Sequence, residues 1–375
     1  MASPIRSRIF GVLPAGQTVE AWTLTGRGGL ELEAITYGGI VTRLLAPDRN
    51  GNAGDVVLGF NDLDSYLAGH PYFGAITGRV AGRISDAAFT LDGNTYRLAR
   101  NDPPNHLHGG VEGFDKRLWS AAPVDHEDGA PSLRFRYHSP DGEEGYPGNV
   151  RVAVTYTVTD QNEFLIETEA VSDRTTPLSL THHSYFNLAG ESSGSIADHR
   201  LQIFASKFVP VDENLTATGR VESTARNGGI FKTPRWVGDA IGHLYQGHGD
   251  LYALPKRKVS EMRPVARLED PASGRVMTVL TTQHYLQLYT GSQLNCSTKG
   301  KSGTAYSRHA GICLECEGYP DAANAARRDD ILLHPGQIQR HATAYAFWVR
   351  NANATGKDRS VCSASKNRKE GTSKR

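Results

Sequence analysis

The stretch VRVAVTYTVTDQNEFLIET, residues 150–168, decides the fold class of this chain. Apolar side chains occupy every second position from Val150 to Val158, and the alternation resumes at Phe164 after the turn-forming residues 160–162. Because the side chains of a strand alternate between two faces, this pattern predicts two strands joined by a short turn, each with one apolar face.

The same period of two recurs along most of the chain. It runs through residues 30–36 and 133–137, and a hairpin is predicted where Asp92-Gly93-Asn94 separates two alternating runs. Many short strands separated by turns indicate an all-β antiparallel sandwich or barrel. Further strand-like runs cover residues 276–282, 285–290, 311–319 and 343–349, and helical spacing is confined to residues 63–68 and 240–245.

The chain has 375 residues, and no linker rich in Pro, Gly or Ser divides residues 8–350. We therefore expect one large β domain over this range. Residues 351–375 contain seven basic and two acidic side chains and no aromatic residue. Such a segment cannot bury enough apolar surface to order itself, so it is predicted to be a basic, disordered tail.

Charge and hydropathy exclude several classes of protein. The 41 Lys and Arg residues balance 40 Asp and Glu residues to a net charge of +1, so no overall field favours nucleic acid or an anionic membrane. No apolar run approaches the ~18 residues of a membrane-spanning helix. The N-terminal MASPIRSRIFGVLPAG does not resemble a signal peptide, and four cysteines are too few for a disulfide scaffold. We expect a cytoplasmic protein.

The segment NHLHGG contains two histidines, His106 and His108, on the same side of an extended chain. Together with Glu112 they imitate the metal-binding spacing of cupins, but the glycines that cupins place around this pattern are absent. The favoured interpretation is a Gly-rich loop without a metal, in which one histidine is exposed and the other is hydrogen-bonded.

The segment THHSYFNLAG, residues 181–190, places His183, Tyr185 and Asn187 on one face of an extended run. Three polar side chains on one face suit a polar ligand such as a sugar. A buried structural network is the alternative, and the pattern by itself does not decide between them.

In GICLECE, residues 311–317, Glu315 and Glu317 share one strand face, whereas Cys313 and Cys316 point to opposite faces. The two cysteines therefore do not form a zinc motif. A carboxylate in an apolar strand either faces solvent or lies in a cleft, where a neighbouring imidazole would make Glu315 a candidate general base.

The segment GRVAGRI, residues 78–84, offers two arginines between glycines that match no nucleotide-binding motif. An arginine here could contact vicinal sugar hydroxyls or a carboxylate, as Arg79 or Arg83 would. The alternative is a surface salt bridge.

Seven blocks, taken together in this order, resemble the aldose 1-epimerases, also called galactose mutarotases. The likeness spans about residues 10–350 and implies the family fold, a large antiparallel β-sandwich (the galactose mutarotase-like supersandwich) with few short helices. The blocks are GRVAGRI (78–84), NHLHGG (105–110), SPDGEEGYPG (139–148), HSYFNLAG (183–190), FVPVDENL (208–215), QLYTG (287–291) and CLE…YPDAAN (313–324).

The resemblance implies that the protein interconverts the α and β anomers of free aldohexoses such as galactose and glucose, without metal or other cofactor. Glu315 matches the family's general base and His183 its general acid, and His108 matches a histidine that contacts the sugar ring. At their ordinary pKa values, the carboxylate and the imidazolium would both be in the required state near pH 7. We expect both groups to lie on opposite sides of one pyranose-sized hollow.

Further sugar contacts are implied for Arg83, Tyr185 and Gln287, and for Asp250 in the segment GHGDLY. Many relatives carry Asn at the position of Gly82, which precedes the binding arginine. The partner is therefore an aldose sugar, with no nucleic acid or membrane, and the protein is expected to be a monomer or weak homodimer.

Three alternatives remain at this stage. A non-catalytic sugar-binding module would not need both Glu315 and His183. A hexose-6-phosphate 1-epimerase would need an additional basic pocket for the phosphate. A glycosidase could use Glu315 and Glu317 as its two carboxylates but would leave the histidines unexplained.

Overall fold

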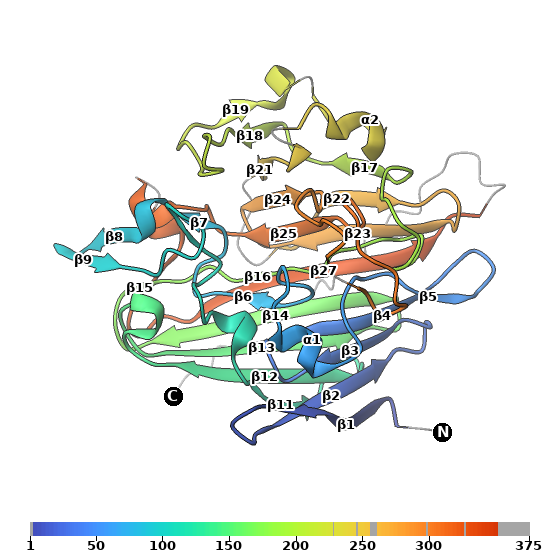
Figure 1. Ribbon diagram of the computed structural model, residues 1–375, viewed down its shortest axis with the longest axis horizontal. Helices are drawn as coiled ribbons and strands as arrows, with labels where there is room; N and C mark the ends of the chain where they lie inside the picture. Colours follow the sequence, from blue (N-terminus) through green and yellow to red (C-terminus); the bar gives the residue numbers. More distant parts are fainter. Residues whose placement is uncertain are drawn as a thin grey trace, which may run out of the picture.

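The computed structural model describes residues 3–227, 229–244, 247–255, 261–297, 299–325 and 328–351. The predicted tail lies outside the described residues from position 352 onward. Figure 1 shows a molecule whose regular structure is almost all strand, with two short helices among the described residues. All named strand pairs are antiparallel, which confirms the predicted fold class.

The largest sheet has nine strands and carries the stretch that decided the fold. Residues 150–168 form the hairpin of β13 and β14, in which Val158 pairs with Phe164. Val154 and Phe164 are both fully buried in the main core, as the alternation predicted. In spatial order the strands are β11 (Ser120–Val124), β12 (Ser132–Ser139), β13 (Val150–Val158), β14 (Glu163–Ser172), β27 (Gln339–Val349), β23 (Arg275–Thr281), β22 (Arg263–Glu269), β17 (Arg200–Ile203) and β20 (Arg235–Trp236).

A five-stranded sheet packs on this one and carries residues of the site. The face of β25 that holds Leu314 and Cys316 joins the main core, and Tyr345 of β27 donates a hydrogen bond to the Leu314 carbonyl at 3.1 Å. The other face of β25 holds Glu315, opposite Gln287 of β24. The strands in order are β19 (Glu222–Ser223), β18 (Lys207–Val209), β21 (Leu251–Ala253), β24 (Tyr285–Tyr289) and β25 (Cys313–Glu317).

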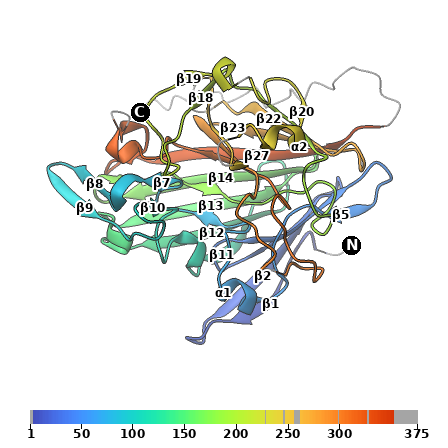
Figure 2. The same cartoon turned by 45° about the horizontal axis from the view of Figure 1, so that its top comes forward.

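The N-terminal strands form a third sheet, drawn in blue in Figure 2. Leu24, Leu32 and Val41 of this sheet are fully buried in the same main core as the β13–β14 hairpin. The sheet therefore shares a core with the rest of the molecule. Its strands are β1 (Ile5–Val12), β2 (Thr18–Thr25), β3 (Glu31–Ile35), β4 (Val41–Pro47) and β5 (Ala53–Asp55).

Short two-stranded pairs bring distant motifs together. β16 (Thr181–His182) pairs with β6 (Ile76–Thr77), and β10 (His106–Leu107) pairs with β7 (Arg83–Ile84). The β10–β7 pair joins NHLHGG to GRVAGRI, and the β16–β6 pair joins the start of THHSYFNLAG to the two residues before GRVAGRI, so these bridges help to determine the geometry of the site. The other pairs are β8 (Ala88–Leu91) with β9 (Asn94–Arg97), which is the predicted hairpin, and β15 (Thr176–Pro177) with β26 (Leu332–Leu333).

Two α-helices occur among the described residues. α1 (Leu63–Leu67) matches its prediction, and the Asp62 side chain caps it by accepting from the Ser65 amide. α2 (Val237–Ile241) begins before the predicted segment 240–245 and shares only its first two residues. Short 3-10 turns lie at η1 (Ser85–Ala87), η2 (Phe114–Lys116), η3 (Glu143–Gly145), η4 (Thr224–Asn227), η6 (Ala322–Asn324) and η7 (Arg328–Asp330).

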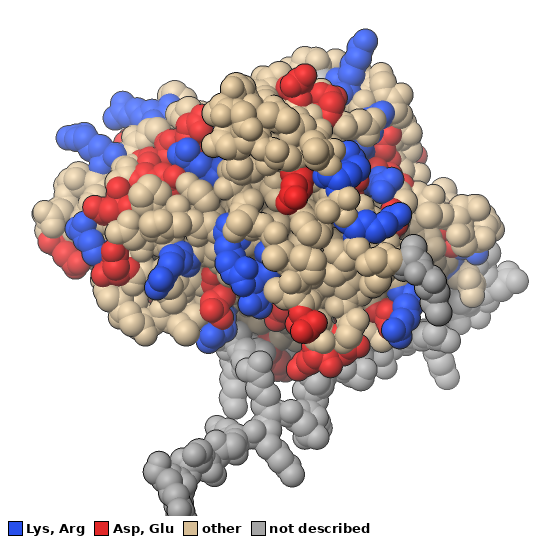
Figure 3. All heavy atoms as spheres, turned by 90° about the horizontal axis from the view of Figure 1, so that it is seen from below, with Lys and Arg blue, Asp and Glu red and all other residues tan. Residues whose placement is uncertain are grey.

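The surface agrees with the near-neutral composition. On the face in Figure 3, acidic and basic side chains of the described residues are interspersed. No helix among the described residues is long and apolar enough to cross a membrane.

Candidate active site

A polar hollow opens between the five-stranded sheet and the loops that carry the sequence motifs. The free space between its atoms, open mouth included, is about 690 Å³. All predicted site residues except Asp250 line it. The lining is Pro71, Tyr72, Gly82, Arg83, Leu107, His108, His183, Tyr185, Val211, Leu215, Ala217, His248, Leu251, Gln287, Tyr289, Gln293, Glu315, Glu317 and Pro320.

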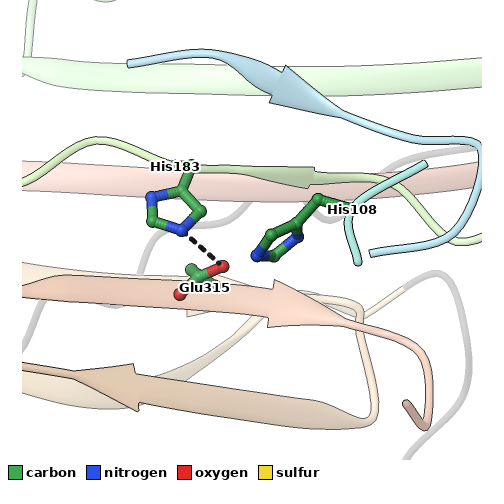
Figure 4. Close-up of side chains that lie close together, drawn as sticks. All are labelled: His108, His183 and Glu315. Atoms are coloured by element: carbon green, nitrogen blue, oxygen red, sulfur yellow. Dashed lines mark ion pairs between the residues drawn. The ribbon is translucent and has the colours of Figure 1, made fainter. Parts of the chain in front are cut away.

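His183 and Glu315, which both line this hollow, lie next to each other (Figure 4). Nε2 of His183 lies 3.4 Å from Oε2 of Glu315, although 132 positions of sequence separate the two residues. The His183 amide donates to the Ala75 carbonyl, next to the β16–β6 bridge, and Glu315 lies in the middle of β25. The two groups share the predicted hollow, but they are neighbours rather than facing each other across it.

Burial sets the protonation of this pair. It raises the pKa of Glu315 to about 8, against the opposing charge of Arg83, and it lowers the pKa of His183 to about 4. The ordinary pKa values expected from the sequence are therefore wrong, because each group is 3% exposed or less and burial disfavours both charged forms. At a pH between these two pKa values, His183 and Glu315 together hold one titratable proton.

His108 is the third member of the cluster, with its ring centroid 5.2 Å from that of His183. The amide of Gly82 donates to Nδ1 of His108 at 3.3 Å, so the hydrogen of the neutral ring lies on Nε2. Burial, followed by the neighbouring His183 and Arg83, holds the pKa of His108 well below its usual value. His108 is thus a neutral hydrogen-bond donor beside His183 and Glu315.

The two histidines of the NHLHGG segment lie in different surroundings. His106 is turned away from the hollow and hydrogen-bonded to the Ala99 carbonyl and the Tyr146 hydroxyl, both at 2.8 Å. The structure does not bring His106 and Glu112 together as a cupin-type metal site, because Glu112 is exposed. His108 is buried against the hollow rather than exposed, which corrects that part of the favoured interpretation.

The atoms that could ligate a metal in this region come from a different set of residues. Ligand atoms of His108, His183 and Glu315 lie within 4.8 Å of one another, and two imidazoles with one carboxylate are a donor set that transition metals accept. Absence of a metal from the working site remains a prediction.

The two arginines of GRVAGRI differ in role. The Arg83 guanidinium lines the hollow and forms an ion pair with Asp102 at 2.7 Å. Arg79 is buried and donates to Ser139 and to the carbonyls of Pro140 and Pro147. Arg79 therefore contacts neither a sugar nor a surface carboxylate, the two possibilities that the sequence left open. Its guanidinium is used instead to hydrogen-bond the end of β12 and the loop that follows.

Known proteins are similar to this chain over most of its length. The sequence profile of the aldose 1-epimerase family matches residues 20–346. The chain belongs to this family. Its relatives include galactose mutarotase of Sus scrofa, 44% identical over 93% of this chain and 100% of that protein, and galactose mutarotase of Homo sapiens, 43% identical with the same coverage. Aldose 1-epimerase of Escherichia coli K12 is 31% identical over 89% of this chain and 96% of that protein.

Solved structures agree with the family fold. An aldose epimerase homologue from C. elegans superposes with a TM-score of 0.80 at 29% identity, covering 88% of this chain and 98% of that chain. The fold of a galactose 1-epimerase from Lactobacillus acidophilus gives the same TM-score at 23% identity, covering 92% and 99%. The resemblance stated from the seven blocks is therefore confirmed.

Within this aldose 1-epimerase family member, the HSYFNLAG block is split between the site and the core. Tyr185 lines the hollow beside His183, with ring centroids 5.2 Å apart, and Tyr289 packs edge-on against Tyr185. Asn187 instead donates to the carbonyls of Gly194 and Ala310. The buried-network alternative therefore holds for Asn187, whereas sugar binding by His183 and Tyr185 remains a prediction.

The predicted aspartate is the site residue that the structure does not place in the hollow. Asp250 does not line it, whereas His248, two residues earlier, does. The His248 ring packs on Tyr289 with a centroid distance of 4.6 Å, and burial lowers the pKa of His248 to about 4. A sugar-binding role for Asp250 remains a prediction, and His248 is the neutral side chain that this aldose 1-epimerase family member presents there.

Sequence reasoning missed Tyr72, His248 and Glu317 as lining residues. The alternation in GICLECE already placed Glu317 on the face of Glu315, so that signal was present. His248 lies beside the aspartate that was chosen instead. Tyr72, whose ring centroid is 4.7 Å from that of His108, lies in a loop with no motif and gave no signal.

Proposed function

We propose that the protein interconverts the α and β anomers of free aldohexoses such as galactose and glucose, with Glu315 as general base and His183 as general acid. As a member of the aldose 1-epimerase family it is an isomerase acting on aldoses. The observation that carries the assignment of roles is the 3.4 Å separation of Nε2 of His183 and Oε2 of Glu315 within one hollow.

The adjacency of the two groups suits the reaction. The anomeric hydroxyl and the ring oxygen are bonded to the same carbon, C1, so a base and an acid must reach atoms that lie side by side. Glu315 removes the hydroxyl proton while His183 protonates the ring oxygen, and the C1–O5 bond breaks to give the open aldehyde. Rotation about C1–C2 presents the other face of the carbonyl, and the reversed proton transfers close the ring.

The proton count of the pair is the same before and after ring opening. The pair reacts from its carboxylate and imidazolium form and ends as carboxylic acid and neutral imidazole, which is the form that burial favours. Closure of the ring restores the charged form. One proton held between His183 and Glu315 therefore serves both directions without exchange with solvent.

The remaining lining residues are proposed to hold the sugar. His108 offers its Nε2 hydrogen because Nδ1 is occupied by the Gly82 amide, and Arg83 offers the guanidinium nitrogens that its Asp102 contact leaves free. Gln287 emerges beside Glu315 from the neighbouring strand, and Tyr185 forms part of the aromatic wall. Gly82 has no side chain and offers the sugar only its backbone atoms.

Polarimetry tests the proposal. Freshly dissolved α-D-glucose or α-D-galactose should relax faster with protein than without it, and Glu315→Gln and His183→Ala should each remove most of the excess rate. Glu167 faces solvent on β14, so Glu167→Gln serves as the matched control. A non-catalytic sugar-binding module would bind the sugar in calorimetry yet leave the relaxation rate unchanged in the unmodified protein.

The hexose-6-phosphate alternative is less favoured by the charge of the hollow. Arg83 is the sole Lys or Arg among the described lining residues, and it is already paired with Asp102. A phosphate dianion would need further cationic donors. Comparing the protein's effect on α-D-glucose and α-D-glucose 6-phosphate distinguishes the two substrates.

We further propose that residues 8–350 act as one catalytic domain, as a monomer or weak homodimer in the cytoplasm, without cofactor, nucleic acid or membrane. Support comes from the main core, which runs from Leu24 to Phe347, and from Cys296, Cys313 and Cys316, which are all free thiols. Sedimentation over a range of concentrations tests the state of association.

A further inference from the structure

Glu317 is a second buried carboxyl in the hollow. Its side chain lies on the same face of β25 as Glu315, is 1% exposed and lines the cavity. Among the described residues, no group hydrogen-bonds its Oε2. Buried polar atoms are nearly always paired, so an unpartnered carboxyl oxygen in the wall of a ligand site points to a partner brought by the ligand.

The wall next to Glu317 is shaped by a missing side chain. Gly82 has φ +73°, and a Cβ on it would lie 2.9 Å from Cβ of Pro320 and 3.7 Å from Oε1 of Glu317. The close approach to Pro320 and the left-handed backbone both favour glycine here. Because Gly82 adds no polar side chain, the Glu317 carboxyl is the side chain that presents hydrogen-bonding atoms on this part of the wall.

The carboxyl is also in a suitable state for a sugar hydroxyl. Burial, and then the charge of Glu315, raise the pKa of Glu317 well above its ordinary value, against the opposing charge of Arg83. A neutral carboxylic acid offers one O–H donor and one carbonyl acceptor. A sugar hydroxyl is likewise a donor and an acceptor, so the two groups can form a pair of hydrogen bonds.

We propose that Glu317 is a specificity-determining, sugar-binding residue that hydrogen-bonds one hydroxyl of the aldose on a carbon other than C1. This inference rests on the proposed function, which gives Glu315 and His183 the anomeric hydroxyl and the ring oxygen. Residues two apart on a strand are separated by about 6.7 Å, so Glu317 reaches a part of the ring away from C1.

Two substitutions separate hydrogen bonding from packing. Glu317→Gln keeps a neutral donor and acceptor of the same size and should leave KM for the preferred aldose within about threefold. Glu317→Leu keeps the bulk but removes both functions, so KM should rise by about tenfold, the value of a neutral hydrogen bond, while kcat changes little. The matched control is Glu167→Leu on the solvent face of β14, which should leave both constants unchanged.

Deoxy sugars then identify the contact. The unmodified protein should bind one member of a 2-, 3-, 4- and 6-deoxyglucose series about tenfold more weakly than glucose, and Glu317→Leu should bind that sugar and glucose alike. Glu317→Asp, which withdraws the carboxyl by one methylene, should show the same pattern if the leucine variant does not fold. Unchanged KM in Glu317→Leu and Glu317→Asp, or an equal loss against every sugar of the series, would overturn the inference.

Calorimetric binding of each sugar keeps this test independent of the proposed function. If the unmodified protein binds glucose but does not accelerate mutarotation, the proposed function fails while the dissociation constants still test Glu317. If mutarotation is present but the Glu317 variants bind every sugar as the unmodified protein does, the inference alone fails.

Discussion

The thiol of Cys313 contacts the His183 ring on the side opposite Glu315. Its Sγ lies 3.6 Å from Nδ1, whereas Nε2 lies 3.4 Å from the Glu315 carboxyl. Burial raises the pKa of Cys313 well above its usual value, so the group remains a thiol. It can donate weakly to Nδ1 of the neutral ring, which favours the hydrogen on Nε2, and its sulfur can accept when the ring is doubly protonated. Cys313 therefore contacts the ring that we propose as the general acid, on the nitrogen that faces away from Glu315.

We predict that Cys313→Ala lowers kcat by up to about tenfold with little change in KM, because a weak hydrogen bond to the acid is lost while the sugar contacts remain. Cys313→Ser should recover part of the rate, since a hydroxyl restores a donor at nearly the same place. Among the cysteines that the structure describes, Cys296 is exposed, and Cys296→Ser is the control. An unchanged kcat in the alanine variant would remove Cys313 from this positioning role.

The pH dependence follows from the proton shared by His183 and Glu315. Above the Glu315 pKa of about 8 the pair loses its proton and has no acid, and below the His183 pKa of about 4 it gains a second proton and has no base. We therefore predict that kcat/KM is high between these values and falls on both sides. The measurement is polarimetric, corrected at each pH for the uncatalysed rate. A loss of kcat/KM that sets in near pH 6.5, the ordinary histidine pKa, rather than near pH 4 would contradict the shared proton.

Replacing the base should affect rate and stability in opposite directions. Glu315→Gln removes the proton acceptor and should lower kcat by about 10²–10⁴-fold with little change in sugar affinity. The folded state raises the Glu315 pKa from 4.5 to about 8, so wild-type folding is disfavoured progressively as pH rises through this window.

The amide cannot ionise, so the advantage in Tm of Glu315→Gln over the wild type should grow from pH 4.5 to pH 8 and then level off. Thermal unfolding followed by circular dichroism measures this difference. Above pH 6.5 the contribution of His183 is constant, because both its folded and its unfolded pKa then lie lower. A Tm difference that shrinks with rising pH would show that Glu315 is not held in its neutral form.

The fold could be predicted from alternation because period two is a local property. Residues 150–168 become the β13–β14 hairpin, with Val158 paired to Phe164. Alternation could not give the order of the nine-stranded sheet, in which β14 pairs with β27, about 170 residues later in the chain. Such pairings depend on tertiary packing, which no short window contains.

Site residues that belong to a recognisable motif could be predicted from the sequence. Properties of the site that depend only on tertiary packing could not. Glu315 and His183 were identified from their blocks, and the structure brings them to 3.4 Å. Their protonation could not be read from the sequence, because it depends on burial by residues from several strands. For the same reason the sequence favoured Asp250, an acidic residue in the expected segment, over His248, whose position on the hollow results from the loop before β21.

The two arginines of GRVAGRI give a final prediction. Replacing Arg79 should change the stability of the protein, and replacing Arg83 should change its affinity for the sugar. Arg79 is buried and donates four hydrogen bonds to the last residue of β12 and the loop that follows it, so Arg79→Lys should lower the free energy of unfolding by about 2–4 kcal/mol and leave KM nearly unchanged. Arg83 borders the hollow, so Arg83→Lys should raise KM about tenfold and change Tm little, because a single ammonium cannot reproduce the guanidinium's array of donors. Urea unfolding and polarimetry measure the two effects. If both variants lost the same affinity for the sugar, bordering the hollow would not be what gives an arginine its effect on KM.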